Sequence, residues 1–202
     1  MNKKVTLSKE NMAAINRDRR VIDNFDCLDA IFRMESVDIN LYRKLLFEMI
    51  DDQQTCLDSI WWCLGEGNEA IYPSKVIPTL ENEKPYDAWF EEGIDILKLL
   101  IDETRKRGLE TFFSYRINGS DNDVADGEST KISKIPMKEA HPEWLIHTWK
   151  ENFNVQHVTK DMNGFWNFAF NGVREHKLKI LQEVCENYDL DGIEKNFART
   201  CP

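Results

Sequence analysis

Short apolar runs alternate along this chain with longer stretches in which apolar residues recur every three or four positions. The short runs are typical of buried strands, and the longer stretches are typical of amphipathic helices. Strands are predicted over residues 20–27, 57–64, 109–117 and 190–197, and helices over residues 41–53, 89–107 and 173–188. Repeated strand–helix–strand units of this kind form parallel sheets through right-handed crossovers.

The stretch 89–107 has the strongest helical pattern in the chain. Its apolar residues Phe90, Ile94 and Leu97 share one face, and Gly108 follows as a stop signal. We therefore expect one continuous helix over this stretch.

A long insert, residues 118–165, separates the third predicted strand from the last helix. It is rich in Asp, Ser, Lys and Pro, and one short helical stretch is predicted near residues 142–150. Loops of this length are usually functional or disordered. The chain thus divides into an N-terminal extension, residues 1–18, and one domain, residues 19–202, that contains the insert.

Composition narrows the classes of partner. A chain of 202 residues, 42% hydrophobic and 31% charged, is long enough for one domain with a buried core. Its formal charge of −10 repels phosphate backbones and anionic lipid surfaces, so we expect neither nucleic acid nor a membrane as partner. No apolar run approaches the roughly 20 residues that span a bilayer, and no signal peptide is visible, which leaves the cytoplasm as the default location.

The metal-binding and redox residue types form no recognisable pattern. The five cysteines include no Cys-x-x-Cys pair, and their odd number disfavours a disulfide framework, so we expect reduced thiols. The four histidines lack the His-Glu-x-x-His spacing of zinc sites, and we expect no metal. The Gly-x-Gly-x-x-Gly phosphate signature is absent after the first strand, so a dinucleotide fold loses support and no cofactor is expected.

Polar and charged residues follow the predicted strands at their carboxyl ends. In a parallel sheet these ends share one edge, which is where such folds bind ligands. The edge would gather Asp26, the segment 61–68, Arg116 with Asn118, and the segment 194–199. We therefore expect the functional site at this edge.

Six segments, taken together, resemble a bacterial family of glycoside-hydrolase-like TIM-barrel proteins. They are residues 19–26, 59–62, 72–76, 105–110, 141–144 and 191–199. The resemblance runs from about Arg19 onward but covers only the amino-terminal half of that family's barrel. It implies an α/β fold, a partial (β/α)8 TIM barrel with about four parallel strands and flanking helices, and a carbohydrate ligand.

The fourth strand of that family usually ends in the pattern Asp-Gly-x-x-x-Asp-Phe-x-Arg, and here Asn196 replaces the second Asp. Retaining glycosidases need a carboxylate nucleophile within about 5 Å of the acid partner, and inverting ones need a carboxylate base. An amide does neither, so Asn196 marks a degenerate catalytic position that can still hydrogen-bond a sugar hydroxyl. Glu194 lies on the same side of the strand and is the candidate proton donor; the alternative is a barrel-interior carboxylate held by a buried Arg or Lys.

Substrate binding is assigned to seven further residues, each with a structural alternative. The alternatives are a loop cap for Asp26, core packing for Trp62, and neutralisation of nearby acids for Arg116. Trp61 and Trp62 point to opposite faces of their strand, so at most one of them lines the barrel. Loop packing or a plain surface charge is the alternative for the remaining four, which are His141, Trp166, Asn167 and Arg199.

A complete barrel of this class has eight strands in roughly 250 residues, whereas four are predicted here. The exposed edges of a half barrel invite pairing. Three explanations stay open: a fragment of a longer protein, half barrels that pair as a homodimer, and an open four-stranded α/β sheet. The corresponding functions are a glycoside hydrolase completed by a further carboxylate, a non-catalytic carbohydrate-binding protein, and a structural half barrel that dimerises.

Overall fold

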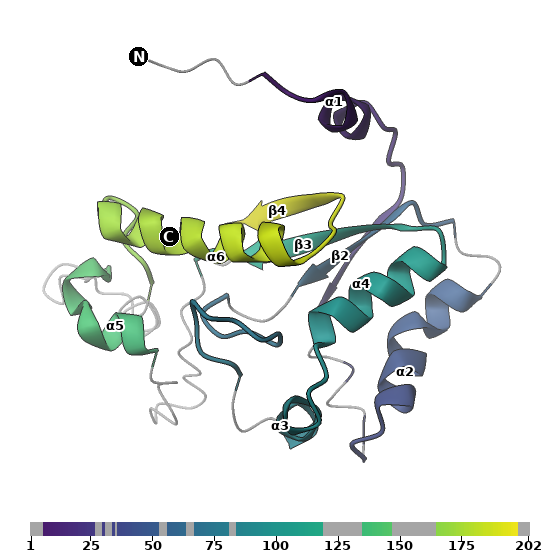
Figure 1. Cartoon of the computed structure of the whole chain (residues 1–202), viewed down its shortest axis with the longest axis horizontal. Helices are drawn as coiled ribbons and strands as arrows, with labels where there is room; N and C mark the ends of the chain where they lie inside the picture. Colours follow the sequence, from purple (N-terminus) through teal and green to yellow (C-terminus); the bar gives the residue numbers. More distant parts are fainter. Residues whose placement is uncertain are drawn as a thin grey trace, which may run out of the picture.

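The computed structural model describes residues 6–26, 30, 34, 36–52, 56–63, 67–80, 84–118, 135–146 and 165–197. These residues contain a four-stranded parallel sheet in the order β1-β2-β3-β4 (Figure 1). Its strands are β1 (Ile22–Asp26), β2 (Ser59–Cys63), β3 (Glu110–Arg116) and β4 (Gly192–Asn196). The predicted α/β fold with four parallel strands is confirmed, and the described sheet is not closed into a barrel.

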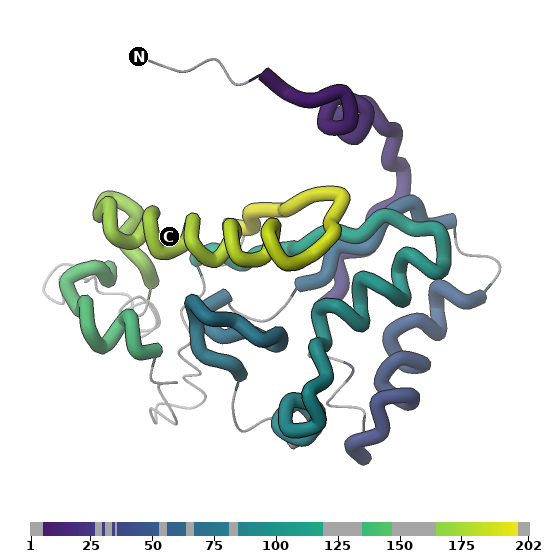
Figure 2. The backbone as a smooth tube through the Cα atoms, viewed as in Figure 1, coloured from purple at the N-terminus to yellow at the C-terminus, as the bar shows by residue number. Residues whose placement is uncertain are grey.

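Helices connect the strands and pack against one face of the sheet (Figure 1). They are α2 (Ile39–Asp51), α3 (Lys84–Glu91), α4 (Ile96–Lys106) and α6 (Asn171–Asn187). The first helix, α1 (Lys9–Ile15), lies apart from them, and Figure 2 shows the backbone running from it into β1. Near the start of α6 lie α5 (Pro136–Ala140) and the 3-10 turn η2 (Pro142–Trp144). None of the helices in the described part of the chain is long and apolar enough to cross a membrane.

The main hydrophobic core lies between the sheet and these helices. Ile60, Trp62 and Phe113 point from the strands into this core and are almost fully buried. The Trp62 indole N–H donates a hydrogen bond of 3.0 Å to the hydroxyl of Thr104 in α4. Residues of α2, α4 and α6 complete the core: Leu46, Phe47, Leu97, Leu100, Ile180 and Val184. Because each buried side chain of this size contributes about 1.5–3 kcal/mol, this face supplies most of the hydrophobic stabilisation of the sheet.

The prediction of a single helix over residues 89–107 is wrong, because the structure has two helices, α3 and α4, in its place. Gly93 adopts a φ of 75°, a left-handed conformation that a helix interior does not accommodate. Two residues later, the carboxylate of Asp95 accepts a hydrogen bond of 3.0 Å from the Lys98 N–H and caps α4. A glycine followed by an N-cap residue therefore divides the apolar stripe into two helices.

Two further differences concern short helices. The N-terminal extension contains α1, which begins after Ser8, whose hydroxyl accepts a 3.1 Å hydrogen bond from the Asn11 N–H. The helical stretch expected near residues 142–150 is shorter and starts earlier, as α5 and η2. Residues 147–150 lie outside the described residues.

Two aspartates fix the starts of neighbouring strands relative to each other. Asp58, just before β2, accepts hydrogen bonds of 2.7 and 2.9 Å from the N–H groups of Arg20 and Val21. Asp191, just before β4, accepts one of 3.0 Å from the Thr111 N–H in β3. A carboxylate that accepts backbone N–H groups replaces ladder bonds where the sheet begins, and so helps to set the register of the strands.

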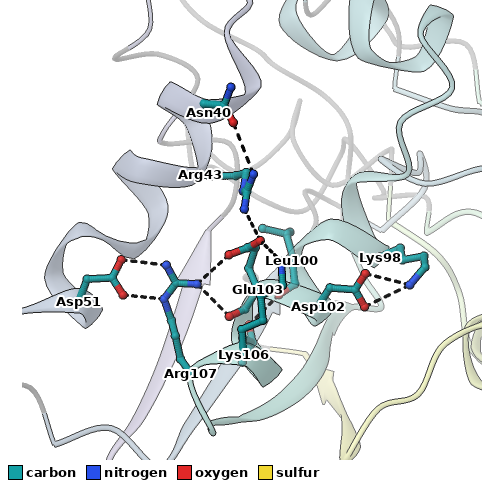
Figure 3. Close-up of polar contacts among 10 residues, drawn as sticks. Asn40, Arg43, Asp51, Lys98, Leu100, Asp102, Glu103, Lys106 and Arg107 are labelled. Carbon is teal, nitrogen blue, oxygen red and sulfur yellow. Dashed lines mark hydrogen bonds and ion pairs between the residues drawn. The ribbon is translucent and has the colours of Figure 1, made fainter.

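A buried carboxylate, that of Glu103, joins α2 to α4 (Figure 3). Glu103 accepts hydrogen bonds of 2.7 Å from Lys106 and 2.9 Å from Arg107, and it also pairs with Arg43 of α2. Arg107 in turn holds Asp51, at the end of α2, through bonds of 2.6 and 2.8 Å. Burial raises the pKa of Glu103, but the hydrogen bonds from Lys106 and Arg107 and the charge of Arg43 outweigh burial and lower the pKa to about 2.

The depressed pKa makes this ion-pair network a pH-dependent source of stability. Glu103→Gln is expected to lower the free energy of unfolding by about 2 kcal/mol at pH 7, because three cations lose a buried charged partner. The difference from the wild type should persist above pH 4.5 and disappear as the pH falls from 4.5 towards 2, where the native carboxylate takes up its proton. Denaturant unfolding at a series of pH values measures this difference.

Asp102→Asn is the matched control, because Asp102 forms only an exposed ion pair with Lys98 on the same helix. It should change stability by about 0.5 kcal/mol or less. An equal loss in the two variants would contradict the role assigned to Glu103.

The loop after β2 crosses the end of β3 at Gly67. This residue has a φ of 76°, and a Cβ placed on it would overlap the carbonyl oxygen of Arg116. The hydroxyl of Tyr115 donates a 2.8 Å hydrogen bond to the Gly67 carbonyl oxygen. The loop is therefore held against the carboxyl end of β3, where only a residue without a side chain fits.

Gly67→Ala is expected to destabilise the protein by about 1–3 kcal/mol more than Gly93→Ala does. Both glycines have a positive φ, so both variants have a similar backbone strain. Only Gly67 has other atoms in the space that a methyl group would fill. Thermal and denaturant unfolding of the two variants separate the packing cost from the backbone cost, and equal losses would exclude the close approach to Arg116.

Candidate functional site

The face of the sheet opposite the helices is lined by polar and aromatic side chains. Alternate residues of a strand point to opposite faces, and Trp62 and Phe113 occupy the helix-covered face. Their neighbours in the strands therefore line the other face, which we call the concave face. The register places these residues in rows across the sheet: Asn24, Trp61 and Phe112; then Asp26, Cys63, Ser114 and Glu194; then Arg116 and Asn196.

Glu194, on the outer strand β4, is held on the concave face by neutral donors. Its Oε2 accepts a 2.7 Å hydrogen bond from the Asn24 side-chain amide and another from the hydroxyl of Ser114. The Asn24 amide also lies 3.2 Å from the Ser114 oxygen. The sequence left open whether a buried Arg or Lys holds Glu194, and in the described part of the chain the amide of Asn24 and the hydroxyl of Ser114 hold it instead.

An ion pair lies at the carboxyl ends of β1 and β3. The guanidinium of Arg116 donates a 2.7 Å hydrogen bond to Oδ2 of Asp26. Both side chains are largely buried, with exposed fractions of 16% for Arg116 and 26% for Asp26. For Arg116 the sequence left two alternatives, substrate binding and neutralisation of nearby acids, and the observed pair with Asp26 is compatible with both.

Asn196 ends β4 beside Arg116, its register partner in β3. Its backbone carbonyl accepts a 3.1 Å hydrogen bond from the Ile117 N–H. The structure thus brings four of the predicted site residues to one edge of the concave face: Asp26, Arg116, Glu194 and Asn196. Together they offer two carboxylates, one guanidinium and one amide, a set that can hydrogen-bond several hydroxyl groups of one ligand.

Deeper in the concave face, aromatic rings replace the polar groups. The rings of Trp61 and Phe112 stack with 4.9 Å between centroids, and the Trp61 indole donates to Ser59. Arg19 lies over the Phe112 ring, 5.1 Å from its centroid, and also pairs with Glu110 at the start of β3. Trp61, which is half-buried, is therefore the tryptophan of this strand that faces the concave side.

Trp62 does not join this group, because it lies on the helix-covered face with an exposed fraction of 0%. Its ring contacts Phe25 and Phe47, and its indole N–H is bonded to Thr104. Trp62 thus lies where core packing, the structural alternative to substrate binding for this residue, places it.

His141, Trp166 and Asn167 lie around the segment that leads into α6. The His141 ring stacks on Trp144 with 3.7 Å between centroids, and its Nδ1 lies 3.0 Å from a Glu143 oxygen. The Asn167 N–H donates a hydrogen bond of 2.7 Å to the Trp144 carbonyl oxygen, and the Asn167 side-chain oxygen accepts a hydrogen bond from the Ala169 N–H. Arg199 lies outside the described residues.

A buried cluster around Lys177 attaches the loop after β2 to α6. The Lys177 ammonium donates hydrogen bonds of 2.7 Å to the Asn68 side-chain oxygen, 3.0 Å to the Tyr115 hydroxyl and 3.1 Å to the Gly67 carbonyl. The same Asn68 oxygen accepts a 2.7 Å bond from the Trp166 indole, and Lys177 lies 5.1 Å from the centre of that ring. Trp166 is therefore a buried member of this cluster.

Sequence reasoning missed Asn24 and Ser114, although a signal for both was present. Each lies two residues before a predicted site residue, Asp26 and Arg116 respectively, and so on the same face of its strand. Lys177 also had a signal, because it occupies the apolar stripe of α6 between Val173 and Ile180.

The described residues contain no group of three His, Cys, Asp or Glu side chains that could hold a metal ion.

Comparison with known proteins assigns a family to this arrangement. A relative, the S-layer-related protein of Niallia circulans, is 26% identical over 121 residues; the match covers 57% of this chain and 7% of the length of that protein. The profile of the family described as glycosyl hydrolase-like 10 matches residues 28–197, which include β2, β3 and β4 and nearly all of the helices. The chain therefore belongs to the glycosyl hydrolase-like 10 family.

Proposed function

We propose that the concave face binds a carbohydrate at its carboxyl edge, through Asp26, Arg116, Glu194 and Asn196. The observation that carries this proposal is the meeting of these four side chains, from three strands, at one edge of a parallel sheet. Charged and amide groups of this kind bind the hydroxyls of a sugar through directed hydrogen bonds. The glycosyl hydrolase-like family to which the chain belongs supports the same ligand class.

Binding without cleavage fits the side chains of the described edge better than hydrolysis does. Hydrolysis by either stereochemical course needs two carboxyl groups with separate roles. Of the two present, Asp26 is paired with Arg116, and Glu194 accepts from Asn24 and Ser114. Asn196 stands where the family pattern has a carboxylate and supplies no charge.

Glycoside hydrolysis is the second candidate, and family membership is the observation that favours it. In that case a carboxylate from outside the described residues acts together with Glu194. The other residues that the sequence assigns to substrate binding near this edge, His141, Asn167 and Arg199, would then contact the sugar, whereas Trp166 is buried against Asn68.

Titration with soluble cello-, xylo- and chito-oligosaccharides, followed by calorimetry or ligand-observed NMR, tests the binding proposal. At least one series should bind, and Asp26→Asn and Glu194→Gln should each weaken binding about tenfold or more, since hydrogen bonds to charged groups are worth about 1.5–3 kcal/mol. Glu92→Gln, which alters an exposed carboxylate after α3, should bind as the wild type does. Absence of binding by all three series, or equal affinity in all variants, would contradict the proposal.

Sugar release from p-nitrophenyl glycosides distinguishes the two candidates. The wild type is expected to bind carbohydrate without releasing sugar. Asn196→Asp, which restores the carboxylate of the family pattern at the same strand position, is compared with it. Release by the wild type would favour the hydrolase and exclude a purely binding role.

A further inference from the structure

The two outer strands of the sheet, β1 and β4, each have a neighbouring strand on one side only within the described sheet. Apolar side chains at these edges are exposed: Val21 by 44%, Ile22 by 41% and Phe197 by 56%. An edge strand with unpaired backbone groups and exposed apolar side chains is a template for another strand. Within the described sheet, both edges therefore offer a surface on which a further strand can pair.

The register of the sheet determines which residues would meet if two copies closed a barrel. In an eight-stranded parallel barrel, a row of paired residues followed once around returns to its first strand displaced by a shear of about eight residues. Two identical four-stranded halves related by a twofold axis share this displacement equally. A row followed across one half is therefore displaced along the strand by about four residues. The right-handed coiling of the strands directs the displacement towards the start of the strand.

The row Asp26, Cys63, Ser114, Glu194 can be followed across the edge in this way. Moving back four residues from Asp26 places Glu194 beside Ile22 of the next copy. Displacement in the opposite sense would carry β4 beyond the end of β1 at Asp26 and leave it without a strand to pair with. Because four is an even number, the inner and outer faces of the two halves remain continuous.

We propose that two copies of this chain pair through these edges, β4 of each copy lying parallel to β1 of the other, with Lys195 beside Asp23 of the second copy. On the outer face the same register places Ile193 beside Val21 and Phe197 beside Phe25 of that copy. Apolar residues thus meet apolar residues, a ring meets a ring, and a cation meets an anion. Pairs of each of these types stabilise neighbouring strands.

Asp23 and Lys195 carry opposite charges. Asp23 is half-buried and burial raises the pKa of its carboxyl, whereas Lys195 is exposed. Neither side chain forms a hydrogen bond or ion pair with another described residue. Within one chain they lie on opposite edges of the sheet, three strand spacings or about 14 Å apart, so they cannot pair there. A contact between them requires a second chain.

The twofold arrangement also closes both edges at once. Each copy contributes one β4 edge and one β1 edge, so the dimer contains the Lys195–Asp23 contact twice and gives each of the described strands a neighbour on both sides. The half-buried rings of Trp61 and Phe112 would then face the interior of a complete barrel instead of solvent. The two charged residues of this contact, Asp23 and Lys195, lie on the helix-covered face, whereas the residues proposed to bind sugar lie on the concave face.

Charge reversal of the chain spanning residues 1–202 tests the interface. Light scattering and sedimentation equilibrium should give twice the chain mass of 23.8 kDa for the wild type at micromolar concentration. Asp23→Lys and Lys195→Glu should each weaken the dimer about tenfold or more, because each places like charges side by side at both contacts. Lys179→Glu, a reversal on the exposed side of α6, should leave the dimer unchanged.

Mixing the two reversed variants is the decisive measurement. In the mixed dimer one contact keeps the original Lys195–Asp23 pair and the other has both charges reversed, so the mixture should associate about tenfold or more tightly than either variant alone. Circular dichroism of each variant checks that the chain is folded before mixing. A monomeric wild type, as expected if further strands of a longer chain cover these edges, would overturn the proposal. A dimer that neither reversal weakens, or a mixture no tighter than its components, would overturn it equally.

Discussion

The alternation of side chains along each strand places every residue of the sheet on one of two faces, and both the core and the site follow from this placement. Ile60, Trp62 and Phe113 fall on the face that the helices cover, whereas Asn24 and Glu194 fall on the other. The shared direction of the four strands brings their carboxyl ends to one edge. Asp58 and Asp191 reinforce it, because each carboxylate holds the start of its own strand to a neighbour.

The position of each strand was predictable because its apolar run is short and bounded by polar or turn residues. The face on which a given residue lies was not, because alternation supplies the spacing of side chains but not the starting side. Trp62 faces the helices because its indole N–H bonds to Thr104 and its ring packs on Phe47. Both partners come from helices, α4 and α2, that are distant from it in sequence. The break between α3 and α4 was overlooked because the apolar stripe continues through it, although Gly93 and Asp95 carry the local signal.

The edge that holds the candidate site was predictable from strand direction, but its hydrogen bonds were not. Asn24 and Glu194 are separated by 170 positions in the chain, and only the register of the sheet brings them together. The contrast between the two carboxylates is also tertiary in origin. Asp26 faces a guanidinium, whereas Glu194 faces an amide and a hydroxyl, so a ligand would meet one carboxyl group paired with a cation and one held by neutral donors.

The contacts of Glu110 bear on where the folding unit starts. This carboxylate, 7% exposed, binds Arg17 and Arg19, both of which precede β1. The stretch shared with the glycosyl hydrolase-like 10 family starts at residue 28, after the whole of that strand. An expression fragment trimmed to the shared stretch would therefore lack β1, and the buried carboxylate of Glu110 would lose both of its arginine partners. Cloning boundaries should be placed upstream of Arg17.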